Sequence, residues 1–77
     1  MNNPIHKITN TANELNQTGT TVASTGEQIA AAFVLNRMEY LPEGYSDIIE
    51  AWDFLGLQWQ GYVRIIKQNS HHMINNK

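Results

Sequence analysis

Aromatic and arginine side chains are the residues of this chain that are best suited to binding a ligand. Trp52, Trp59 and Tyr62 lie in the same stretch as Arg64, and Arg37 lies further upstream. A planar ring beside a guanidinium can stack on a nucleotide base and neutralise its phosphate. At helical spacing, however, aromatic side chains usually pack in a core, so ligand binding is the alternative interpretation. The candidate partner or ligand contacts are Phe54, Leu57, Arg64, Arg37 and Tyr45.

The residue types needed for catalysis are missing or badly placed. There is no cysteine nucleophile, no glycine-rich phosphate loop, and no G-x-S-x-G or H-E-x-x-H motif. His6, His71 and His72 could bind a metal through their imidazoles. Adjacent histidines next to a helix end do not point the same way, and no carboxylate is close to them in sequence. We therefore expect no enzyme, no cofactor and no metal site.

The composition indicates one small folded domain over residues 1–77. The chain has 77 residues, of which 42% are hydrophobic. A chain of this size buries only ~60% of its unfolded surface. Without cysteines it has no disulfide to strengthen its core, so a partner chain is a natural remedy. The net charge of −2, with 16% charged residues, argues against nucleic-acid binding.

The apolar runs are too short to span a membrane, and the first ten residues lack the apolar stretch of a secretory signal. We therefore expect a cytoplasmic protein. Its small size suggests a bacterial or phage origin.

The clearest predicted element is a helix over residues 47–68. Ser46 is a suitable N-cap, and Pro42 and Gly44 indicate a turn just before it. Its apolar residues alternate by four and three positions, as on a helix that packs along one seam. These residues are Ile48, Trp52, Leu55, Trp59, Tyr62 and Ile66.

A similar seam in the first half favours one long helix from about 6 to 40. Its members are Ile8, Ala12, Leu15, Gly19, Val22, Gly26, Ile29, Phe33, Asn36 and Tyr40. The stretch TGTTVASTG, residues 18–26, would then be helical, with both glycines on the seam. The alternative is a break within 18–26, because Ser24 and Glu27 fit a capping box that could start a second helix.

These elements predict an all-α fold in which two helices form an antiparallel hairpin. With the turn near residues 43 and 44, facing residues have numbers that sum to about 85 to 87. Trp59 then faces Gly26, and Trp52 faces Phe33. The predicted core or interface residues are Gly19, Val22, Gly26, Ile29, Phe33, Ile48, Trp52, Leu55, Trp59, Tyr62 and Ile66.

Apolar residues outside the seam predict association between chains. The second helix carries further apolar side chains around its circumference, which two helices alone would not cover. We therefore expect a homo-oligomeric helical bundle with a flexible tail at 69–77. In the alternative, residues 5–17 fold back as a third helix and cover this surface. The function we predict is a non-catalytic protein-interaction module, such as a regulator or inhibitor of a larger bacterial or phage assembly. The alternative is an oligomer that binds a nucleotide or another small molecule at subunit junctions.

Overall fold

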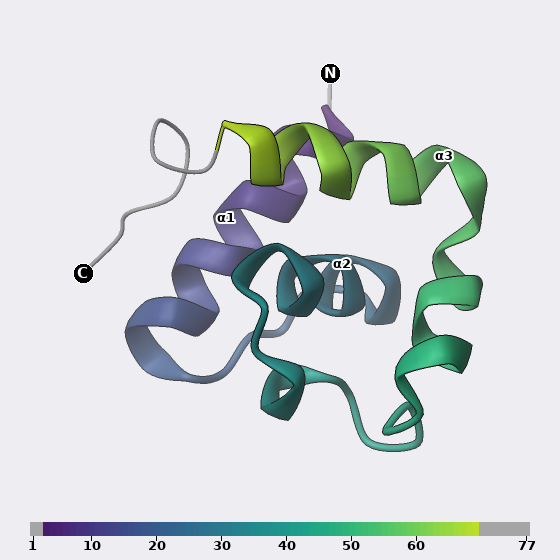
Figure 1. Ribbon diagram of the computed structural model, residues 1–77. Helices are drawn as coiled ribbons and strands as arrows, with labels where there is room; N and C mark the ends of the chain where they lie inside the picture. Colours follow the sequence, from purple (N-terminus) through teal and green to yellow (C-terminus); the bar gives the residue numbers. More distant parts are fainter. Residues whose placement is uncertain (1–2, 70–77) are drawn as a thin grey trace.

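The computed structural model describes residues 3–69, and they form an all-helical fold (Figure 1). No strand occurs within this range. The elements are α1 (Pro4–Thr18), α2 (Thr25–Leu35), a short 3₁₀ helix η1 (Met38–Tyr40) and α3 (Ile48–Gln68).

The first helix ends where the long-helix prediction expects it to continue. Asn3 caps the start of α1 by accepting a hydrogen bond from the Ile5 amide at 2.9 Å. Gly19 ends the helix in the left-handed conformation, with φ 80°, and its N–H donates to the Leu15 carbonyl at 2.8 Å. A glycine in this conformation is a common helix terminator because it has no Cβ to clash. The prediction of one helix from 6 to 40 is therefore wrong.

The capping box starts a new helix, as the alternative proposed. The Ser24 hydroxyl accepts from the Glu27 amide, and the Glu27 carboxylate accepts from the Ser24 amide, each at 3.3 Å. This reciprocal pair satisfies two amides that have no partner inside the helix. At its other end α2 stops at Asn36, which adopts a left-handed φ of 60°.

The helix predicted over 47–68 is confirmed, with two differences in detail. Its N-cap is Asp47, whose carboxylate accepts from the Ile49 and Glu50 amides, whereas Ser46 makes no cap. The helix is also bent, because Gly56 has the non-helical angles φ 78° and ψ 168°.

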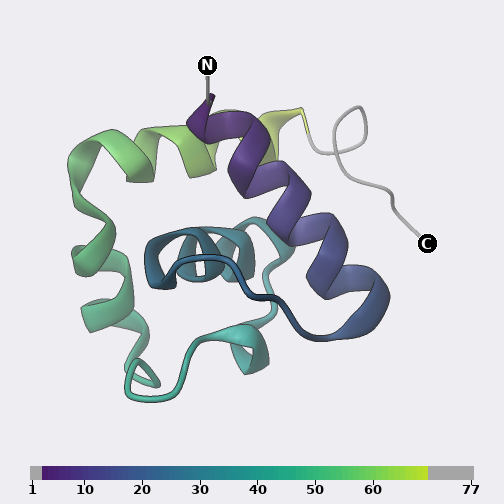
Figure 2. The same ribbon diagram turned by 180° about the vertical axis from the view of Figure 1, so that it is seen from behind.

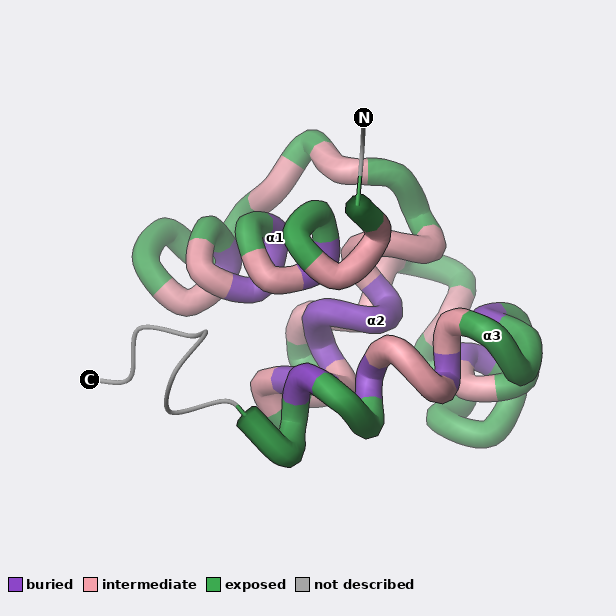
Figure 3. Tube along the Cα trace, turned by 90° about the horizontal axis from the view of Figure 1, so that it is seen from above, coloured by how far each residue is buried: buried purple, intermediate pink, exposed green. Residues whose placement is uncertain are grey.

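The helices α1 and α3 are arranged around α2. In Figures 1 and 2, α2 lies in the middle, α1 crosses on one side, and the two halves of α3 run around it at an angle. Seen from above and coloured by burial, α2 is the most buried helix (Figure 3). Lys7 and Glu27 form an ion pair of 3.7 Å between α1 and α2. Residues 3–69 thus form three α-helices and the short η1, with the N-terminal segment folded back, in place of the expected two helices.

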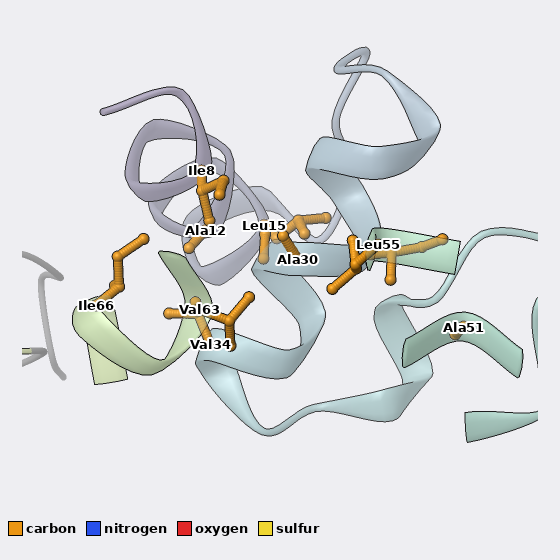
Figure 4. Close-up of a cluster of buried hydrophobic side chains, with 11 residues drawn as sticks. Ile8, Ala12, Leu15, Ala30, Val34, Ala51, Leu55, Val63 and Ile66 are labelled. Carbon is orange, nitrogen blue, oxygen red and sulfur yellow. The ribbon is translucent and has the colours of Figure 1, made fainter. Parts of the chain in front are cut away.

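The core lies between α2 and the other helices and consists largely of small side chains (Figure 4). The largest fully buried side chains are Ile8, Leu15, Ile29, Ile66 and Val63. Alanine fills much of the remaining space and is fully buried at Ala12, Ala30, Ala31, Ala32 and Ala51.

The predicted core or interface residues fall into three groups. Ile29, Leu55 and Ile66 are buried in the core. A second group is partly buried, and it comprises Gly26 together with Phe33, Trp52, Trp59 and Tyr62, which pack against the core. A third group, Gly19, Val22 and Ile48, is exposed, and the side chain of Val22 is 99% exposed. Val22 and Gly19 leave the core because the chain between α1 and α2 is a connection and not a helix.

The predicted pairing of facing residues is partly confirmed. Phe33 and Trp52 do meet, with ring centroids 5.0 Å apart in an edge-to-face arrangement. Gly26 is only partly buried, and it lies beside Phe54 rather than the expected Trp59. The bend at Gly56 explains this difference, since one register cannot hold for both halves of a bent helix.

Candidate binding surfaces

The bend in α3 brings together residues that a straight helix would keep far apart. Trp52 and Arg64 are twelve positions apart, which is ~18 Å along a straight helix. In the structure the Arg64 Cζ lies only 5.5 Å from the centre of the Trp52 ring. The guanidinium covers the face of the indole, a favourable cation–π geometry. Gly56 thus allows one helix to form two sides of a site.

A buried glutamine holds the two halves of α3 together. Gln60 is only 8% exposed, and its Nε2 donates to the Trp52 carbonyl oxygen at 2.8 Å. These residues lie on opposite sides of Gly56. The hydrogen bond spans eight positions, so it requires the bend and fixes its angle.

A groove of about 370 Å³ lies between the end of α2 and the two halves of α3. It is lined by Phe33, Asn36, Trp52, Val63, Arg64 and Lys67. The edge-to-face rings of Phe33 and Trp52 form its apolar side together with Val63. Of this set, the sequence had singled out Phe33 and Trp52 as core and Arg64 as a possible ligand contact.

Two cations border this groove. The Lys67 Nζ donates to the Phe33 carbonyl oxygen at 3.0 Å, and the same oxygen accepts from the Asn36 amide at 3.1 Å. Within residues 3–69, neither Lys67 nor Arg64 forms an ion pair with a carboxylate. The groove therefore combines an aromatic wall with two positive charges that have no acidic partner in this part of the chain.

Arg37, the second arginine with possible ligand contacts, has a different environment. It lies over the Tyr40 ring at 5.5 Å, and its Nε is 3.4 Å from the Glu39 carboxylate. The hydrogen bond to the Tyr40 hydroxyl, the charge of that group and then Glu39 raise the pKa of Arg37. Arg37 is exposed, is paired within its own loop and does not line the groove.

The second half of α3 presents an apolar outer face, which consists of Leu57, Gly61 and Ile65. These residues are four positions apart and therefore lie along one side of the helix. Leu57 is 87% exposed and Ile65 is 43% exposed. A Cβ added at Gly61 would meet no atom within 4 Å, so the space beside it is open.

The other two candidate contacts lie together near the start of α3. Tyr45 and Phe54 pack edge to face with ring centroids 5.1 Å apart. Phe54 is half exposed, and the space beside Gly26 at the start of α2 is bounded by its ring. Ile49, five positions earlier in α3, is 71% exposed.

Within residues 3–69, no three histidine, cysteine or acidic side chains are grouped so that they could hold a metal ion. His71 and His72 lie outside the described residues, as does the predicted tail apart from Asn69. None of the described helices has the length and hydrophobicity needed to cross a membrane.

Comparison with protein-family models, with curated protein sequences and with solved structures gives no match for this chain. The function is therefore inferred from the geometry of the apolar outer face and of the groove.

Proposed function

We propose that this chain is a non-catalytic protein-interaction module that self-associates through the outer face of α3. The observation that carries the proposal is the distribution of large apolar side chains. Much of the core is alanine, while Leu57 and Ile65 on the outer face of α3 are 87% and 43% exposed. Burying one such side chain stabilises a protein by ~1.5–3 kcal/mol, so covering this face would add substantially to a small core.

The shape of the outer face suits a second helix. Leu57 and Ile65 flank Gly61, where the missing side chain lets another helix axis come close. In a dimer with two-fold symmetry, the same face of a second copy would supply the matching surface. Two copies would then form a helical bundle with α3 against α3 at its centre. An interface at this face would also account for its exposed apolar side chains, because exposed apolar patches commonly mark sites of association.

The residue types available support a non-catalytic role. The sequence has no cysteine and none of the common nucleophile or phosphate-loop motifs. A module of this kind acts by presenting a surface. In the concrete form that we propose, it is a cytoplasmic regulator or inhibitor of a larger bacterial or phage assembly.

The test is the molar mass in solution, measured by light scattering on a size-exclusion column at several protein concentrations. The mass should rise above the 8.8 kDa of one chain as the concentration increases. A Leu57→Glu/Ile65→Glu variant should remain at the mass of one chain, because the added charges cannot be buried unpaired.

The matched control is Asn10→Glu/Gln17→Glu, which adds the same charge at exposed positions of α1. It should associate as the unchanged chain does. A single-chain mass at every concentration would overturn the proposal. Equal association of the two double variants would also overturn it.

A further inference from the structure

We infer that the groove between α2 and the bent α3 binds a small planar aromatic molecule that carries a negatively charged oxygen group, either a carboxylate or a phosphate. The site lies within one chain and does not depend on self-association. It differs in this respect from a pocket at a junction between subunits.

The size and lining of the groove favour an aromatic ligand. Its volume of about 370 Å³ is in the lower part of the ~300–1,000 Å³ range of small-molecule sites. The rings of Phe33 and Trp52, which pack edge to face, line the groove, and Val63 adds an aliphatic side chain to the lining. A flat ring can pack against such a surface over most of its area, whereas a branched polar molecule would leave it uncovered.

The charges favour a ligand with an anionic oxygen group. The planar guanidinium of Arg64 presents a fork of donors that matches a carboxylate or a phosphate. The Lys67 ammonium uses one hydrogen on the Phe33 carbonyl and has two more to donate. The chain as a whole is acidic, with a net charge of −2, yet these two cations share one groove without an acidic partner in residues 3–69.

A comparison of Arg64 with Arg37 shows that the site is more than an arginine stacked on an aromatic ring. Arg37 and Arg64 both lie 5.5 Å from an aromatic ring centre. Arg37 is already paired with Glu39 and borders no groove, whereas Arg64 is unpaired among the described residues and lines one. Of the two arginines, only Arg64 is therefore placed to bind the anionic group of a ligand whose ring packs in the groove.

The test is a titration of the full chain with naphthalene-2-carboxylate, followed by ¹H–¹⁵N NMR. We expect saturable shifts of the Trp52 indole N–H and of the Asn36, Arg64 and Lys67 signals. Naphthalene-2-carboxamide, which has the same ring without the charge, should bind at least about tenfold more weakly, the difference that one charged hydrogen bond produces. Acetate, which has the charge without the ring, should also bind weakly. A parallel titration with adenosine monophosphate shows whether a phosphate or a carboxylate is preferred.

Substitutions then assign the binding to the two cations. Arg64→Gln and Lys67→Gln should each weaken binding of the tighter probe, the former by at least about tenfold. Both positions are exposed, so the fold should be retained, and the unliganded spectrum checks this. Arg37→Gln is the matched control and should leave the affinity unchanged.

Three results would overturn the inference. The first is the absence of saturable groove shifts with both the carboxylate and the phosphate probe. The second is equal affinity for the carboxamide and the carboxylate, which would mean that the groove is only an apolar hollow. The third is an equal loss of affinity for Arg37→Gln and Arg64→Gln, which would indicate general charge attraction.

Discussion

Gly56 is the residue at which α3 bends. Its angles, φ 78° and ψ 168°, belong to a region that is open almost only to glycine. Without this conformation α3 would be straight, and Trp52 could not lie against Arg64 across the groove. Gln60 then secures the bend through its hydrogen bond to the Trp52 carbonyl.

Gly56→Ala should therefore destabilise the fold by ~1–3 kcal/mol, because the new Cβ strains the required backbone conformation. Gly61→Ala is the matched control. In the single chain Gly61 is helical with open space around it, so at concentrations too low for self-association alanine there should stabilise the fold by ~0.5–1 kcal/mol. Urea unfolding followed by circular dichroism measures both. An unchanged or increased stability for Gly56→Ala would show that the bend is not needed.

The sequence does not distinguish these two glycines. Both stand inside an apolar pattern that is typical of a helix. Gly56 departs from helical angles because the two halves of α3 pack around α2, a tertiary effect that no local pattern records. The same bend explains why the Phe33–Trp52 contact could be predicted, whereas the position of Arg64 against Trp52 could not. Val63 and Lys67 lie beyond the bend and were not identified.

At the scale of elements, local capping signals were more informative than the long hydrophobic period. The spacing of four and three continued through residues 18–26 and favoured one helix. Gly19 and the Ser24–Glu27 capping box interrupt the helix instead. At each end of the break, backbone groups are hydrogen-bonded by nearby residues: the Gly19 N–H donates to the Leu15 carbonyl, and Ser24 and Glu27 cap each other's amides. The spacing of four and three continues across the break because Gly19 and Gly26 are seven positions apart, which is the length of one heptad. The cap residue of α3 was misplaced by one position for a similar reason, as Ser46 and Asp47 are both good caps.

Asp47→Ala should destabilise the chain by about 0.5–2 kcal/mol, because two amides at the start of α3 lose their acceptor. Ser46→Ala should change the stability by less than about 0.5 kcal/mol, as expected for an exposed site without such a role. Thermal unfolding of the two variants beside the unchanged chain provides the measurement. A larger loss for Ser46→Ala than for Asp47→Ala would show that the cap has been assigned to the wrong residue.

At the scale of the whole molecule, the apolar spacing predicted the helical class, and the register predicted one aromatic contact. The number of helices and the way in which they pack against one another could not be predicted. A chain with two long helices and one with three shorter helices share the same apolar periodicity, and only the break decides between them. Once α1 folds back on α2, it covers part of the apolar surface that had suggested association. The outer face of α3 remains uncovered, and the proposed self-association depends on this surface.

The most direct test of this central claim is a dilution series followed by ¹H–¹⁵N NMR, because it reports both whether chains associate and which residues meet. We predict that the amide signals of Leu57, Gly61 and Ile65 shift progressively with concentration, while those of Asn10 and Gln17 on α1 stay fixed. Signals that do not move on dilution, or that move on α1 and not on the outer face of α3, would contradict the claim.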